Sequence, residues 1–137
     1  MPVLKRWLPV VAWSAVILIA SSDYFSAAHT GSFLRGLFGG DVPPLLHYAL
    51  RKLGHLLGYG ILGALALRAA RVDLQRPVLA AFAIVVLVAA IDEAHQATVP
   101  SRGGTGWDVL LDVVGAAIAI GLMIRVQKYR ASRRNTE

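Results

Sequence analysis

Four apolar runs, separated by one long and two short more polar segments, dominate the hydrophobic pattern of this chain. They cover about residues 7–22, 53–67, 78–91 and 109–124. Each run is slightly shorter than the ~20 residues that a helix needs to cross the hydrocarbon core of a bilayer. The runs can reach that length only by including the polar residues at their borders. We therefore expect those polar residues to belong to helix ends and not to loops.

The pattern predicts an all-α fold, a membrane four-helix bundle with four transmembrane helices. The bundle is expected to form one domain over residues 1–128, followed by a basic, disordered tail over residues 129–137. In the long connection after the first helix, residues 32–38 are mostly apolar and are a candidate for a short interfacial helix. The four helices are expected at about residues 6–24, 45–68, 77–97 and 107–128.

The composition supports a membrane protein. Hydrophobic residues make up 56% of the chain and charged residues only 16%, whereas a soluble domain carries about 25% charged residues. The chain contains no cysteine, which excludes disulfides and thiolate metal sites. The first run follows Lys5 and Arg6 and has the outline of a signal peptide. We interpret it as a retained anchor, because the remaining sequence does not have the pattern of a secreted domain.

The basic residues predict the orientation in the membrane. They lie at the ends of the apolar runs and not along one face, so the net charge of +6 does not indicate a nucleic-acid partner. Lys and Arg favour the cytoplasmic side of a membrane. Most of them fall in the two termini and in the turn at residues 68–76, while most acidic residues and all His fall in the alternate connections. Both termini are therefore predicted to be cytoplasmic, and the acidic side is predicted to face outward.

The densest polar stretch is IDEAHQATVPSRGGTGWD, from Ile91 to Asp108, between the third and fourth helices. On the second helix, Lys52, His55 and Tyr59 are spaced i, i+3, i+7 and therefore share one face. Three helix ends should meet at the outer edge of the bundle with their polar side chains close together. We call these side chains the rim cluster. Its members are Lys52, His55, Tyr59, Asp92, Glu93, His95, Gln96, Arg102, Asp108 and Asp112.

Spacing also predicts how the third helix presents its polar residues. Asp92, His95 and Gln96 are expected on one face, and Glu93 about a quarter turn away. The adjoining loop carries Arg102.

Asp112 lies one turn inside the apolar run of the fourth helix. A charge in hydrocarbon costs about 2.5 kcal/mol or more, and it persists where it faces the bundle interior and is paired. Lys52, His55 and Arg102 are the candidate partners of Asp112. Asp108 is on the same helix face and can cap the helix N-terminus, where a carboxylate is favourable.

Two segments carry a specific combination of these residues. KLGHLLGYGILGALAL begins at Lys52, and DEAHQATVPSRGGTGWDVLLDVVGAAIAIG begins at Asp92. This combination resembles the VanZ-like family of small bacterial membrane proteins, which is named for a protein linked to teicoplanin resistance. The resemblance covers about half of the chain, from Leu50 to Gly121. It implies a multi-pass protein of the bacterial inner membrane but no defined reaction, and resistance itself is not expected to transfer.

Three functions are compatible with the rim cluster. We favour binding or modulation of an envelope lipid, a lipid-linked glycan or a glycopeptide at the outer membrane rim. The alternatives are a membrane-embedded enzyme that uses acid–base chemistry on a lipid-linked phosphate or glycan, and a purely structural set of charged contacts. The candidate catalytic residues are His95, Asp92, Glu93 and His55, and the candidate ligand-binding residues are Lys52, Tyr59, Gln96, Arg102, Asp108 and Asp112.

No cofactor is expected, and no metal site is predicted. His55, Glu93, His95 and Asp108 have suitable ligand atoms, but Glu-x-His is not a metal-binding signature. The basic side chains of the rim cluster would also repel a metal ion. The expected partners are membrane lipids and an envelope glycan or lipid-linked headgroup. The small residues on the helix faces also permit a homodimer.

Overall fold

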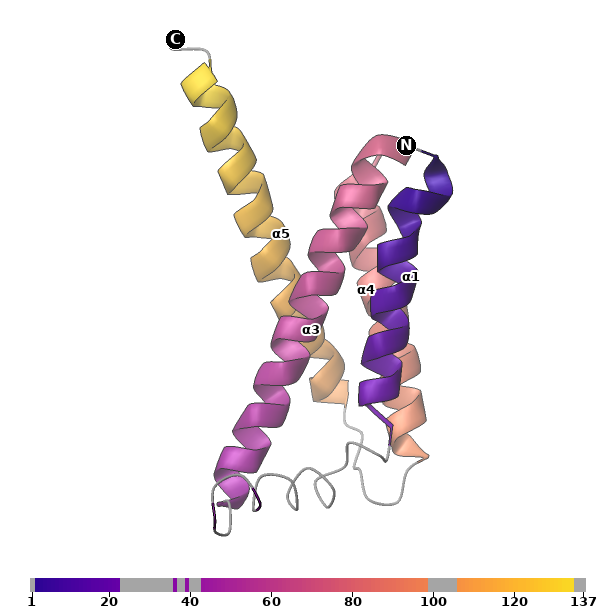
Figure 1. Ribbon diagram of the computed structural model, residues 1–137, viewed down its shortest axis with the longest axis vertical. Coiled ribbons are helices and arrows are strands. Elements are labelled where there is room, and N and C mark those ends of the chain that lie inside the picture. Colours follow the sequence, from indigo (N-terminus) through magenta and orange to yellow (C-terminus); the bar gives the residue numbers. More distant parts are fainter. Residues whose placement is uncertain (1, 23–35, 37–38, 40–42, 99–105, 135–137) are drawn as a thin grey trace.

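The structure is a computed structural model that describes residues 2–22, 36, 39, 43–98 and 106–134. Within these ranges the long elements are all α-helices, and there is no strand. All four helices are long and apolar enough to cross a membrane. The predicted all-α membrane fold is therefore confirmed. The helices are α1 (Val3–Ala20), α3 (Pro44–Asp73), α4 (Pro77–Ala97) and α5 (Gly106–Arg134) (Figure 1).

Two of the helices are longer than the sequence pattern predicted. α3 starts with Pro44 at its first position, where proline is favoured because that N–H has no helical partner. It continues past its predicted end to Asp73. α5 continues to Arg134, so residues 129–134 are helical and are not a disordered tail. This part of α5 consists largely of residues with good helix propensity, and its positive charges interact favourably with the C-terminal end of the helix dipole.

The first helix is displaced toward the N-terminus relative to its expected range. α1 begins at Val3 and ends at Ala20, with Ser21 as its C-cap. The candidate interfacial helix at residues 32–38 lies outside the described residues, apart from Gly36.

α3 is the central helix and contacts each of the other three long helices (Figure 1). α4 also contacts α1 and α5. Both chain ends lie at one end of the bundle, whereas the C-terminal end of α4 and the start of α5 lie at the other (Figure 1). α5 packs on α3 through its N-terminal half and then diverges from it, and no residue of α5 after Ile120 is buried.

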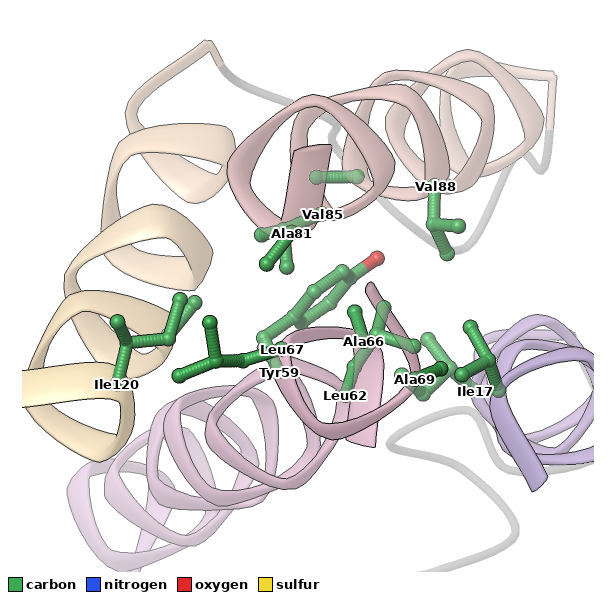
Figure 2. Close-up of a cluster of buried hydrophobic side chains, with 13 residues drawn as sticks. Ile17, Tyr59, Leu62, Ala66, Leu67, Ala69, Ala81, Val85, Val88 and Ile120 are labelled. Carbon is green, nitrogen blue, oxygen red and sulfur yellow. The ribbon is translucent and has the colours of Figure 1, made fainter. Parts of the chain in front are cut away.

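The apolar core lies between α3 and the helices around it. Leu62 and Leu67 of α3 are fully buried. Figure 2 shows them with Val85 from α4, Ile120 from α5 and Ile17 from α1. Large apolar side chains also cover the outer faces of all four helices and remain exposed. Helices that are hydrophobic on every side are typical of membrane spans, because lipid surrounds their outer faces.

Glycines allow α3 and α5 to approach closely. A Cβ atom added to Gly63 would lie 2.9 Å from the Cβ atom of Ala116. A Cβ atom added to Gly115 would overlap the carbonyl oxygen of Leu56 and lie 3.0 Å from its carbonyl carbon. Small residues at such crossings let helix backbones pack directly against each other in membranes. The backbone of α5 therefore rests on the backbone of α3 at this point.

α1 is fastened to α3 by polar contacts at two levels. Near the chain termini, Arg6 Nη2 lies 2.5 Å from Asp73 Oδ1, and the Trp7 indole N–H donates to Asp73 Oδ2 at 2.8 Å. In the middle of the bundle, the Trp13 indole N–H donates to the carbonyl oxygen of Gly58 at 2.8 Å. These contacts orient a helix that contributes only two residues, Val10 and Ile17, to the buried core.

We predict that Gly115→Ala destabilises the bundle by about 1–3 kcal/mol, because the added methyl group meets the backbone of α3, which cannot yield as a side chain can. Gly121→Ala, on the same helix, is the matched control, because a Cβ atom there has nothing within 4 Å. The measurement is the thermal unfolding midpoint of the purified protein in detergent. Equal midpoints for the two variants would contradict the close contact of α3 and α5.

Candidate functional site

Two side chains of α3 pair with the two aspartates at the start of α5. Lys52 Nζ forms an ion pair with Asp108 Oδ1, and His55 Nδ1 lies 3.2 Å from Asp112 Oδ1. The partners are spaced three apart on α3 and four apart on α5, so each pair occupies one turn of both helices. The side chains of Lys52 and His55 are 20% and 15% exposed, and those of Asp108 and Asp112 are 12% and 3% exposed. The cluster thus becomes more buried from the first pair to the second.

A buried hydrogen bond joins α3 to α4 next to these pairs. The Tyr59 hydroxyl donates to Asp92 Oδ2 at 3.1 Å. The Tyr59 ring is almost fully buried and extends from α3 toward α4 (Figure 2). It stacks near the His55 ring, with the ring centroids 6.2 Å apart. Lys52, His55 and Tyr59 therefore act from one face of α3, and each contacts an aspartate on a neighbouring helix.

Two buried polar atoms on α4 lack partners within the described part of the chain. They are Asp92 Oδ1 and Gln96 Nε2, which lie one helical turn apart. The two residues are only 1% and 3% exposed. An unsatisfied buried donor or acceptor costs about 1–3 kcal/mol. The site thus combines satisfied contacts between helices with one open acceptor and one open donor.

The other rim-cluster residues are placed differently. His95 is exposed, although spacing predicted that it shares a face with Asp92 and Gln96. The reason is the helical rotation: relative to residue i, residue i+3 lies about 60° to one side and residue i+4 about 40° to the other. Glu93 is partly exposed. Arg102 lies outside the described residues.

A family model described as VanZ/LLP1 matches residues 6–127. The chain belongs to the VanZ/LLP1 family. The match extends into all four helices and confirms the resemblance carried by residues 50–121. Together with the four membrane-crossing helices, it establishes a multi-pass membrane protein of this family. Searches of curated proteins and of solved structures gave no match.

This VanZ/LLP1 protein also brings together a set of metal-ligand types that the sequence did not single out. His55, Asp92 and Asp112 each offer one ligand atom, and these atoms lie within 4.8 Å of one another. The metal ligands considered from the sequence were His55, Glu93, His95 and Asp108, and only His55 belongs to this group. The informative signal was the placement of Asp112 inside an apolar run and of Asp92 directly after one, because both carboxylates must turn toward the interior to avoid lipid.

We predict that Tyr59→Phe lowers the free energy of unfolding of this protein by about 1–3 kcal/mol, because it leaves the second oxygen of the buried Asp92 carboxylate without a donor as well. Tyr129→Phe is the control, since that side chain is 59% exposed and keeps its ring near Arg133. Thermal unfolding in detergent measures both. A Tyr59→Phe midpoint equal to that of Tyr129→Phe would show that the hydroxyl does not support Asp92.

Proposed function

We propose that this VanZ/LLP1 protein binds, without chemical conversion, the polar headgroup of an envelope lipid or lipid-linked glycan through the rim cluster. The observation that carries the proposal is the open pair on α4. Asp92 Oδ1 is a buried acceptor and Gln96 Nε2 a buried donor, and neither has a partner among the described residues. A headgroup that presents hydroxyl or amide groups supplies both missing partners.

The location of the cluster supports this kind of ligand. The Lys52–Asp108 and His55–Asp112 contacts lie near the start of α5, and the Tyr59–Asp92 hydrogen bond lies further inside a bundle whose outer surface is otherwise apolar (Figure 1). In a membrane, the ends of spanning helices lie at the level of the lipid headgroups. Polar side chains converging there meet headgroups and not acyl chains.

The charges of the cluster further restrict the kind of headgroup that it can recognise. Lys52 is already paired with Asp108, and His55 already contacts Asp112. Neither is therefore available as a simple phosphate-binding cation. For the described residues of the cluster, recognition through hydrogen bonds to sugar hydroxyls or amides therefore fits better than recognition of a bare phosphate.

We place the rim cluster on the outer side of the bacterial inner membrane and both termini in the cytoplasm. The basic residues support this orientation, since Lys5 and Arg6 near the start and the basic end of α5 belong to the end of the bundle opposite the cluster. Lipid-linked glycans exposed at the outer leaflet would then be accessible to the site.

Gln96→Leu should reduce headgroup retention by about tenfold or more, because it removes the open donor without altering a described contact. Gln127→Leu, at the opposite end of the bundle near Arg71, is the matched control and should behave as wild type. The measurement is native mass spectrometry with lipid extraction on protein purified from bacterial membranes in mild detergent. The proposal fails if wild type carries no lipid enriched over the bulk membrane, or if both Gln variants retain it equally.

The orientation is tested by thiol labelling, since the chain contains no cysteine of its own. Thr98 at the end of α4 and Ser132 near the end of α5 are both exposed. In intact cells, a membrane-impermeant maleimide should label Thr98→Cys, and it should label Ser132→Cys only after permeabilisation. The reverse labelling would move the rim cluster to the cytoplasmic side and exclude outer-leaflet ligands.

A further inference from the structure

We infer that His55, Asp92 and Asp112 form a binding site for one divalent transition-metal ion of the Mn²⁺ or Zn²⁺ class. The three residues lie on three different helices, α3, α4 and α5, and their side chains come together inside the bundle. Their potential ligand atoms lie within 4.8 Å of one another. This inference deepens the proposed function, because it assigns an ion to the same site, but it rests on the geometry of the site and not on a bound headgroup.

The donor set suits such an ion. Imidazole nitrogens and carboxylate oxygens are both ordinary ligands of first-row divalent metals, and this class of ion accepts mixed nitrogen and oxygen ligands. Atoms bound about 2.1 Å from one ion lie roughly 3 Å apart. His55 Nδ1 and Asp112 Oδ1 are already 3.2 Å apart. Closing the set around an ion therefore requires the Asp92 oxygen to approach the other two ligand atoms from within 4.8 Å to roughly 3 Å.

The charge of the site also calls for a cation. Asp92 and Asp112 are 1% and 2% exposed. Within the described residues, neither contacts a lysine or an arginine. The neighbouring Lys52 does not oppose a metal ion strongly, because its charge is compensated by Asp108. Two buried carboxylates beside an imidazole match the charge of a divalent ion.

A second, independent observation concerns the carboxylate of Asp92 itself. Asp92 Oδ1 is buried and has no hydrogen-bond partner in the part of the chain that the structure describes, while its other oxygen accepts from Tyr59. A proton on Oδ1 would create a donor that still has no described acceptor. A metal ion would instead use this oxygen together with the facing atoms of His55 and Asp112, and Tyr59 would orient the carboxylate from outside the coordination sphere.

Three protein ligands leave at least one coordination position for water or for an oxygen atom of a ligand. An ion held here would take Asp92 Oδ1 as a ligand, so the proposed headgroup would then bind through the open position on the ion and through Gln96 Nε2. The ion would give the acid-rich cluster a positive centre that Lys52, already paired, does not supply.

The test is Mn²⁺ binding to the full chain, purified in detergent and stripped of metal with a chelator. Binding is measured as the loss of the free Mn²⁺ signal in electron paramagnetic resonance. Wild type should bind one ion per chain. Asp92→Asn should weaken binding by at least about tenfold, because outer-sphere changes alone weaken metal sites about 10–100-fold. Glu93→Gln is the matched control, since it removes an adjacent, partly exposed carboxylate that lies outside the ligand set.

A second pair of variants separates the histidines. His55→Ala should weaken Mn²⁺ binding as Asp92→Asn does, whereas His95→Ala, on an exposed side chain, should not. If a variant fails to fold, spin-echo measurements on wild type labelled with ¹⁵N-histidine decide the question, because a ligating imidazole couples directly to Mn²⁺. Absence of stoichiometric binding, absence of that coupling, or equal losses in Asp92→Asn and Glu93→Gln would each overturn the inference. Metal binding without lipid retention would support the ion site and reject the headgroup proposal. Lipid retention without metal binding would support the headgroup proposal and reject the ion site.

Discussion

The direct backbone contact between α3 and α5 is the constraint on which the geometry of the rim cluster depends. Gly115 of α5 rests against the backbone of Leu56, the residue that follows His55. Asp112 is one turn before Gly115 on its own helix, so it faces His55 across the same crossing. A larger residue at the crossing would separate the helices by more than these short side chains can bridge. The small residues of α5 are therefore a requirement of the polar site as well as of the packing.

Stability alone does not explain the polar residues of α4. The pairs Lys52–Asp108 and His55–Asp112 satisfy each other and fix the register of α3 and α5. Buried ion pairs are, however, often replaceable by apolar residues without loss of stability. Asp92 adds a further difficulty, because only one of its oxygens is satisfied within the described residues. A buried carboxylate that is incompletely paired is costly for the fold, and the proposed ligand would supply its missing partner.

The sequence predicted the fold well, because it follows from a simple pattern. Polar residues of α3, α4 and α5 do come together, but His95 of the predicted rim cluster is exposed and Arg102 lies outside the described residues. Apolar runs locate helices, and polar residues at their ends must meet where the helices end. The choice of partners could not be predicted in the same way. Asp112 had three candidate partners in the sequence, and the structure pairs it with His55 because the glycine crossing fixes the relative height of α3 and α5. The exposed position of His95 likewise depends on the rotation of α4 about its axis, which spacing alone leaves open.

The sequence did not predict the polar contacts between α1 and α3 at the opposite end of the bundle. A basic turn was expected there, but α3 instead continues to Asp73. That aspartate accepts from two nitrogens of Arg6 and from the indole of Trp7, so both of its oxygens are satisfied. Asp73 and Asp92 therefore differ in how completely their carboxylate oxygens are hydrogen-bonded within the same bundle. At the terminal end the carboxylate completes a closed contact between α1 and α3, which is what a structural role requires. At the rim end the carboxylate of Asp92 retains an oxygen with no partner among the described residues and lies near an imidazole and a second carboxylate, and this is the observation on which the proposed headgroup and ion sites rest.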